Sequence, residues 1–168
     1  MKKILNYFLI ACAFMTVQFF GDNIVSAKPV MENADTSICT ADKSEKFPIP
    51  MLVKLDQISP NQVQISYDRD VDIKLATKST NYWIQDIANA KPKGIATLGK
   101  NDKVNDKNSL TDSMVKIQSK DGSAKTFILT LDKNIPKGTE YKLIICYVTV
   151  EGAPAYSGDN GMSTFVGK

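Results

Sequence analysis

The feature that most constrains the fold is the stretch Gly138–Val148, which is rich in β-branched and aromatic side chains. A turn signal, Pro136-Lys137-Gly138, stands directly before it. Side chains of these types fit a pleated, half-buried surface. The stretch therefore predicts a long strand with which the other apolar segments of the chain can pair.

The rest of the chain contains short apolar segments separated by turn signals. Val63, Ile65 and Tyr67 alternate with polar residues, which is the period-two pattern of a half-buried strand. The pair Asp121-Gly122 predicts the turn of a hairpin. We expect partner strands at 51–58, 62–67, 81–86, 115–118, 126–131 and 162–166, with a short, weak one at 95–98. About seven short strands without a convincing amphipathic helix predict an all-β fold, an antiparallel β-sandwich.

Residues 99–112 interrupt this pattern, because they are dense in Asn, Asp, Lys and Ser. Such a composition predicts a long exposed loop. It contains a polar cluster of Asn101, Asp102, Asn105 and Asp106, which we interpret as part of that loop.

Residues 1–27 have the pattern of a signal peptide. Lys2 and Lys3 supply the positive start, the apolar stretch 4–20 follows, and Val-Ser-Ala at 25–27 fits a cleavage site. We therefore expect a secreted or cell-envelope protein with no membrane span after cleavage. The alternatives are a retained membrane anchor and a lipid anchor on Cys12, which ends a lipobox-like Leu-Ile-Ala-Cys sequence.

Residues 28–50 are polar and contain Pro29, Pro48 and Pro50, which favours an irregular lead-in to a domain at 51–168. Cys39 in the lead-in and Cys146 in the long strand are the cysteines that remain after cleavage. Because thiols tend to oxidise outside the cytosol, we predict a disulfide between them. Closing a loop of this length would stabilise the fold by about 4–5 kcal/mol on the chain-entropy account. Two free thiols, or pairing between chains, are the alternatives.

The charge balance and the absence of histidine exclude several classes of function. The chain carries 21 basic and 18 acidic residues, a net charge of +3, and no histidine. Arg69 is its only arginine, so the chain has few groups that can form bidentate hydrogen bonds with phosphates or nucleic-acid bases. Histidine is the commonest general base and metal ligand, so a His-dependent catalytic triad and a His-ligated zinc site are excluded. We expect neither a nucleic-acid partner nor a cofactor.

Several strand ends and turns carry a family resemblance: ISPNQVQISY at 58–67, DVD at 70–72, NYWI at 81–84, FILTL at 127–131 and IPKGTEYKL at 135–143. Together they resemble a bacterial immunoglobulin-like (Ig-like) domain of the kind found in surface-layer and other cell-envelope proteins, over residues 51–166. The resemblance implies an Ig-like sandwich that serves as a non-catalytic spacer or adhesion module. Such domains commonly have a Gly-Asn pair after the last long strand, where this chain has Glu-Gly-Ala-Pro at 151–154.

The family pattern also implies that Tyr82 and Ile84 point inward, which would leave Trp83 pointing outward because side chains alternate along a strand. An exposed tryptophan can anchor a partner or stack on a sugar ring. Trp83 is therefore the candidate partner-binding residue, with a cell-wall glycan or a surface protein as the partner. A shift in register that places Trp83 in the core is the alternative.

The same alternation leaves Ile144, Cys146 and Val148 on the outer face of the long strand. An apolar stripe on the outside needs cover. We expect the lead-in, tied through Cys39, to supply it.

Asp68, Asp70 and Asp72 have the spacing of the first three ligands of a calcium loop. However, Ile73 stands where the sharp turn of such a loop requires glycine, and no glutamate stands at the twelfth position. We assign no metal and interpret the three acids as a solvated strand end, with calcium as the alternative.

Two hypotheses for function follow. The first is a secreted or envelope-associated, non-catalytic Ig-like module that binds a protein or glycan or has a structural role. The second is a secreted hydrolase that acts on cell-wall polymers through paired carboxylates. The acidic residues stand mainly in loops and at strand ends, which favours the first.

Overall fold

The computed structural model describes residues 47–168, and within them the chain is built almost entirely of strands and loops. The strands are β1 (Leu52–Ser59), β2 (Gln62–Tyr67), β3 (Tyr82–Asp86), β4 (Val115–Ser119), β5 (Thr126–Leu131), β6 (Glu140–Cys146) and β7 (Asp159–Val166). One helical turn, α1 (Ile73–Ala76), and two 3₁₀ turns, η1 (Ser79–Asn81) and η2 (Asp106–Asn108), interrupt the loops. The predicted signal peptide and most of the predicted lead-in lie outside the described residues.

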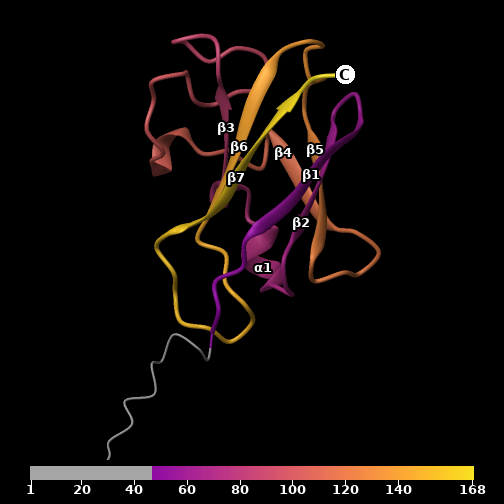
Figure 1. The fold of residues 1–168 in the computed structure, drawn as a ribbon, viewed down its shortest axis with the longest axis vertical. Coiled ribbons are helices and arrows are strands. Elements are labelled where there is room, and N and C mark those ends of the chain that lie inside the picture. The colour runs from indigo at the N-terminus through magenta and orange to yellow at the C-terminus, as the bar shows by residue number, and fades with distance from the viewer. Residues whose placement is uncertain (1–46) are drawn as a thin grey trace, which may run out of the picture. The chain divides into compact units, whose positions relative to one another are not determined.

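The strands form two antiparallel sheets (Figure 1). One has four strands in the order β1-β2-β5-β4, and the other has three in the order β3-β6-β7. The long strand predicted from the sequence is the centre of the three-stranded sheet, since β6 pairs with both β3 and β7. The all-β class and the antiparallel pairing are therefore confirmed.

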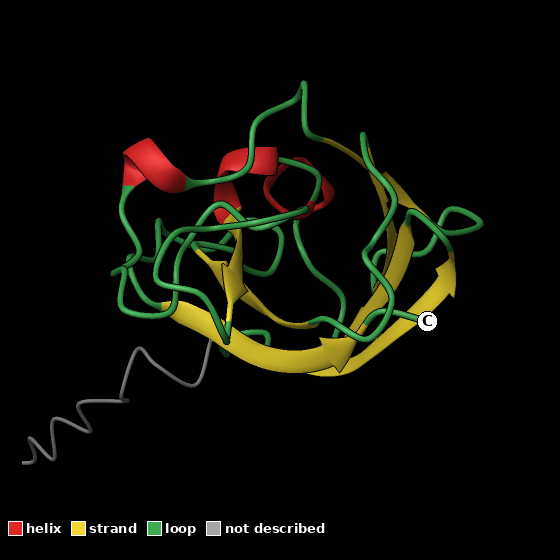
Figure 2. Cartoon of the chain, turned by 90° about the horizontal axis from the view of Figure 1, so that it is seen from above, coloured by secondary structure: helices red, strands yellow, loops and turns green. Residues whose placement is uncertain are grey.

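The two sheets share one main apolar core, because the side chains that alternate inward from both of them belong to a single cluster. Val63, Ile65 and Tyr67 of β2 are buried in it, as their period-two pattern predicted. Tyr82 and Ile84 of β3 enter the same core from the opposite sheet. Figure 2 shows the strands curving along one side, with the helical turns on the other.

The prediction of a short, weak strand at 95–98 is wrong. This segment lies beside β3, but it contributes only an isolated bridge between Gln85 and Leu98. The carbonyl of Ile84 instead accepts from the amides of both Thr97 and Leu98, a geometry that does not extend into a ladder.

The prediction that Val148 faces outward is also wrong, since Val148 lies in the main core. The cause is Tyr147, whose φ of 69° turns the backbone immediately after β6 ends. A residue in this left-handed region reverses the direction of the side chains that follow it, so strand alternation does not extend past Cys146.

Asn160 joins three parts of the domain through its buried side chain. Its Nδ2 donates to the carbonyl oxygens of Pro50 (2.9 Å) and Val148 (2.7 Å), and its Oδ1 accepts from the amide of Val148 (2.9 Å). The segment before β1 and the segment after β6 are thereby fastened to the start of β7.

Candidate functional site

The outer face of the three-stranded sheet carries a second apolar cluster, separate from the main core. It consists of the buried residues Trp83, Leu98, Ile144 and Cys146, with Val104 and Tyr147 packed against them. Trp83 is on β3 and Ile144 is its direct partner on β6, so the two side chains lie next to each other on that face.

The strand register of Trp83 is as predicted, but its predicted exposure is wrong. Tyr82 and Ile84 face the main core, and Trp83 faces the other way, as alternation requires. Nevertheless Trp83 is 0% exposed, because residues 98–110 pass over it. We call residues 98–110 the cover segment. Trp83 thus offers no surface to a partner.

The cover segment is fixed to Trp83 by hydrogen bonds. The indole Nε1 donates to the backbone oxygen of Asn105 and to Oδ1 of Asn108, both at 3.0 Å. Asn105 also caps η2 by accepting from the amide of Lys107 at 2.9 Å. The polar cluster predicted in this loop therefore includes Asn105, which helps to shape the cover segment. The interpretation of 99–112 as a wholly exposed loop is wrong, since Leu110 is buried.

Cys146 lies beneath this cover, is only 7% exposed, and forms no disulfide within residues 47–168. Burial, together with the nearby charge of Asp159, raises its pKa. Leu98 and Val104 of the cover segment pack in the cluster with Ile144 and Cys146. Residues 28–46 of the lead-in, which were expected to cover this stripe, lie outside the described residues. Cys39 lies outside the described residues, so its predicted disulfide with Cys146 stays a prediction.

Tyr147 brings an aromatic ring to the surface beside the cover segment. It is half-buried, and its ring meets the indole of Trp83 at 80° with ring centroids 6.0 Å apart. Positive φ is rare for a bulky aromatic residue, and strained backbone conformations cluster at ligand-binding positions. Sequence reasoning missed this residue, because nothing in the sequence marks its backbone angle.

A hollow of about 300 Å³ lies in front of Tyr147. We call it the Tyr147 hollow; its lining residues come from the η1 region, from η2 and from the end of β6: Lys78, Thr80, Asn81, Asp106 and Tyr147. Its volume is at the lower end of the range for small-molecule sites, about 300–1,000 Å³. The lining combines an ammonium group, a hydroxyl, an amide, a carboxylate and a phenol ring, so it can exchange several hydrogen bonds with one ligand.

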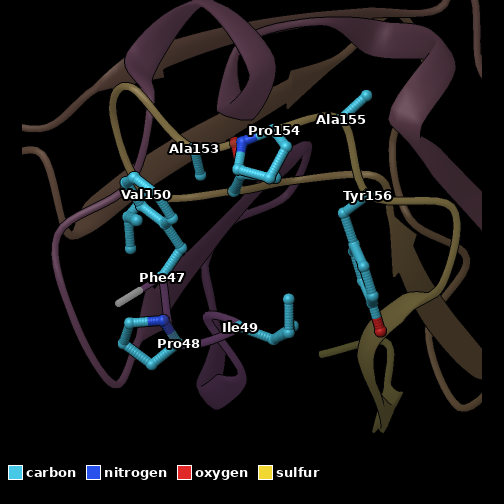
Figure 3. A pocket seen from close by; sticks show the side chains of 9 residues that line it. Phe47, Pro48, Ile49, Val150, Ala153, Pro154, Ala155 and Tyr156 are labelled. Carbon is cyan, nitrogen blue, oxygen red and sulfur yellow. The ribbon is translucent and has the colours of Figure 1, made fainter. Parts of the chain in front are cut away.

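A smaller, apolar hollow of about 110 Å³ lies where the described chain begins. Figure 3 shows Phe47 and Pro48 on one side of it and Tyr156 on the other, with Pro154 above. Few polar side-chain groups line this hollow, so it offers little to orient a ligand.

Two of the three acids that suggested a calcium loop, Asp68 and Asp72, have structural contacts. Asp68 accepts from Arg69 Nη2 at 2.6 Å, which lowers the pKa of its carboxyl group, and also from the amide of Met51. Asp72 caps α1 by accepting from the amide of Lys74 at 2.8 Å. Within residues 47–168 no three acidic, cysteine or histidine side chains come together to hold a metal ion.

Asp86 at the end of β3 is buried and holds the following turn. It accepts from the amides of Ala88 and Asn89, each at 2.9 Å, and from the side-chain amide of Asn89. Burial raises the pKa of this carboxyl group, but the hydrogen bonds from Asn89 and Ala88 outweigh it and bring the pKa below its ordinary value. Its carboxylate stabilises a turn.

In the part of the chain that the structure describes, no helix is both long and apolar enough to span a membrane.

No family model matches the sequence, and no curated protein matches it either. Among solved structures, the chain is similar to parts of the bacterial S-layer protein SbsC. The N-terminal part of SbsC aligns with 70% of this chain at 11% identity and a TM-score of 0.47, and domains 1–6 of SbsC align with 73% at 13% identity and a TM-score of 0.48. The chain spans 23% and 14% of the lengths of those two structures. At this similarity the likeness carries no information about function.

Proposed function

We propose that this chain is a secreted, cell-envelope-associated module with an Ig-like fold, and that its role is structural or partner-binding rather than catalytic. The observation that carries the proposal is the strand order. Sheets of β1-β2-β5-β4 and β3-β6-β7 correspond to the A-B-E-D and C-F-G sheets of a constant-type Ig domain. Within residues 47–168, seven strands in sequence order produce this arrangement with no strand left over.

The details differ from those of antibody domains. In antibody domains a tryptophan on the third strand packs in the core against a disulfide between the second and sixth strands. Here Trp83 is on the third strand, but it lies on the outer face under the cover segment. Tyr67, Tyr82 and Phe127 fill the main core instead. The core of this domain therefore differs from that of antibody domains.

The non-catalytic role is supported by the contacts of the acids. A hydrolase with paired carboxylates needs two of them to converge on one cleft. Asp68 is paired with Arg69, Asp72 caps a helical turn, and Asp86 holds a loop. Each of these carboxylates already serves the fold.

Secretion can be tested by expressing the full chain with a C-terminal tag in a bacterial host and fractionating the cells. We expect the tagged chain in the medium or envelope fraction, at the mass of residues 28–168. An uncleaved chain in the cytosol would contradict the proposal of a secreted module.

The non-catalytic role needs a second assay. Purified residues 28–168 should release no reducing ends from cell-wall polymers. Turnover that is lost in a carboxylate variant would favour the hydrolase instead.

A further inference from the structure

We propose that the Tyr147 hollow is a binding site for one neutral, hydroxyl-rich sugar unit of an envelope glycan. This deepens the proposed function, since it assigns a ligand class and a site to the module. Trp83 was the residue expected to stack on a sugar. The structure instead places Trp83 beneath the surface, with Tyr147 as the ring that is partly exposed.

The Tyr147 ring is oriented by its edge-to-face contact with Trp83, and this contact uses only part of the ring surface. A ring held in advance loses little conformational entropy on binding. Aromatic rings with a polar tip suit ligands that have both an apolar face and hydroxyl groups, as a sugar has.

The side chain of Asn81 brings an accepting oxygen to the hollow. Its Nδ2 donates to the carbonyl of Leu75 at 2.9 Å, which fixes the amide group. No hydrogen bond within residues 47–168 occupies its Oδ1, and this oxygen is not among the buried atoms that lack a partner, so it is open to the hollow that the side chain lines. A ligand hydroxyl can therefore donate to it.

The charges of the lining residues select a neutral ligand. Lys78 and Asp106 place one positive and one negative group at the rim, and no side chain of residues 47–168 pairs with either of them. A phosphate or a sulfated sugar would meet Lys78 favourably but would be repelled by Asp106. Hydroxyl groups can instead accept from the ammonium group and donate to the carboxylate, and both bonds are charge-assisted.

The experiment uses residues 28–168 on a printed array of neutral and acidic oligosaccharides, followed by titration of the best-bound neutral one. The emission of Trp83, the only tryptophan, reports binding because its ring touches Tyr147. We expect saturable binding of a neutral saccharide. Binding of acidic sugars alone, or of none, would overturn the proposal.

The variants test whether the hollow is the site. Tyr147→Asn removes the ring while keeping a residue that tolerates positive φ, and Lys78→Met removes the ammonium group. Lys116→Met is the matched control, since Lys116 is exposed on β4 in the other sheet. We expect affinity to fall at least about tenfold in both hollow variants and to stay unchanged in the control, with circular dichroism showing that all three fold.

The two proposals can fail separately. If Tyr147→Asn binds the saccharide as well as the natural chain does, the hollow is not the site, but the secreted module stands. If the natural chain stays in the cytosol or cleaves wall polymers, the proposed function fails whatever the array shows.

Discussion

At the scale of single residues, two buried polar side chains organise loops that no sequence pattern could identify. Asn160 joins the segment before β1 to the segment after β6, and Asp86 holds the turn after β3. Asn and Asp are frequent throughout the loops of this chain, so their type alone does not separate these two from the solvated ones. Only the burial of both residues distinguishes them.

The lowered pKa of Asp86 predicts a pH dependence of stability. A carboxyl group whose folded pKa lies below its unfolded value of about 3.9 binds fewer protons in the folded state. Its contribution is therefore fully present above that unfolded pKa and is lost as the pH falls through the folded pKa. We expect Asp86→Asn to lose about 1–3 kcal/mol of unfolding free energy at neutral pH, and to lose part of the acid sensitivity of the natural chain.

The measurement is urea unfolding between neutral pH and the acid range. Asp132→Asn, an exposed residue in a loop, is the matched control and should stay within about 0.5 kcal/mol of the natural chain. Equal acid sensitivity of Asp86→Asn and the natural chain would show that Asp86 has no such role.

At the scale of elements, the strands that have one buried face could be predicted from the sequence, whereas the position of the cover segment could not. The predicted strand at 126–131 coincides with β5, because its alternation reflects one buried and one less buried face. Residues 98–110 are mostly polar, and they contact Trp83 through two hydrogen bonds to its indole and through Leu98 and Val104. Local composition contains no information about such a contact, so the exposure of Trp83 was predicted wrongly.

Two glycines with the same backbone conformation provide a matched pair for the loops. Gly94 and Gly138 have φ of 65° and 70°. A Cβ on Gly138 would meet nothing within 4 Å, whereas one on Gly94 would overlap the Tyr141 hydroxyl and lie 2.9 Å from Pro136 Cγ.

We expect Gly138→Ala to cost only the conformational strain, about 1–2 kcal/mol. Gly94→Ala should cost about 1–3 kcal/mol more, because Tyr141 and Pro136 must also move. Thermal unfolding of the two variants measures the difference. Equal midpoints would mean that the loop at Gly94 does not pack against Tyr141.

At the scale of the whole molecule, the packing of both sheets on one core could be predicted from the seven segments and their turns. The second cluster was expected in part, since Ile144 and Cys146 do face outward, but its cover comes from residues 98–110. Tyr147 determines where the pattern ends, because its positive φ sends Val148 back into the main core.

The predicted disulfide links the lead-in to this second cluster, and counting thiols tests it. We expect residues 28–168, produced by secretion and unfolded without reductant, to contain no reactive thiol and to run as a monomer. Two reactive thiols would contradict the bond, and a disulfide-linked dimer would show pairing between chains.

The cover segment seals the outer face of the three-stranded sheet, and its Asp106 lines the Tyr147 hollow. The seal is tested most directly by the fluorescence of Trp83 in residues 28–168, with acrylamide as a quencher. We expect short-wavelength emission and weak quenching, both lost on unfolding, because the indole is 0% exposed. Long-wavelength emission with strong quenching in the folded chain would mean that the face is open, and that the cover segment does not lie over Trp83 in solution.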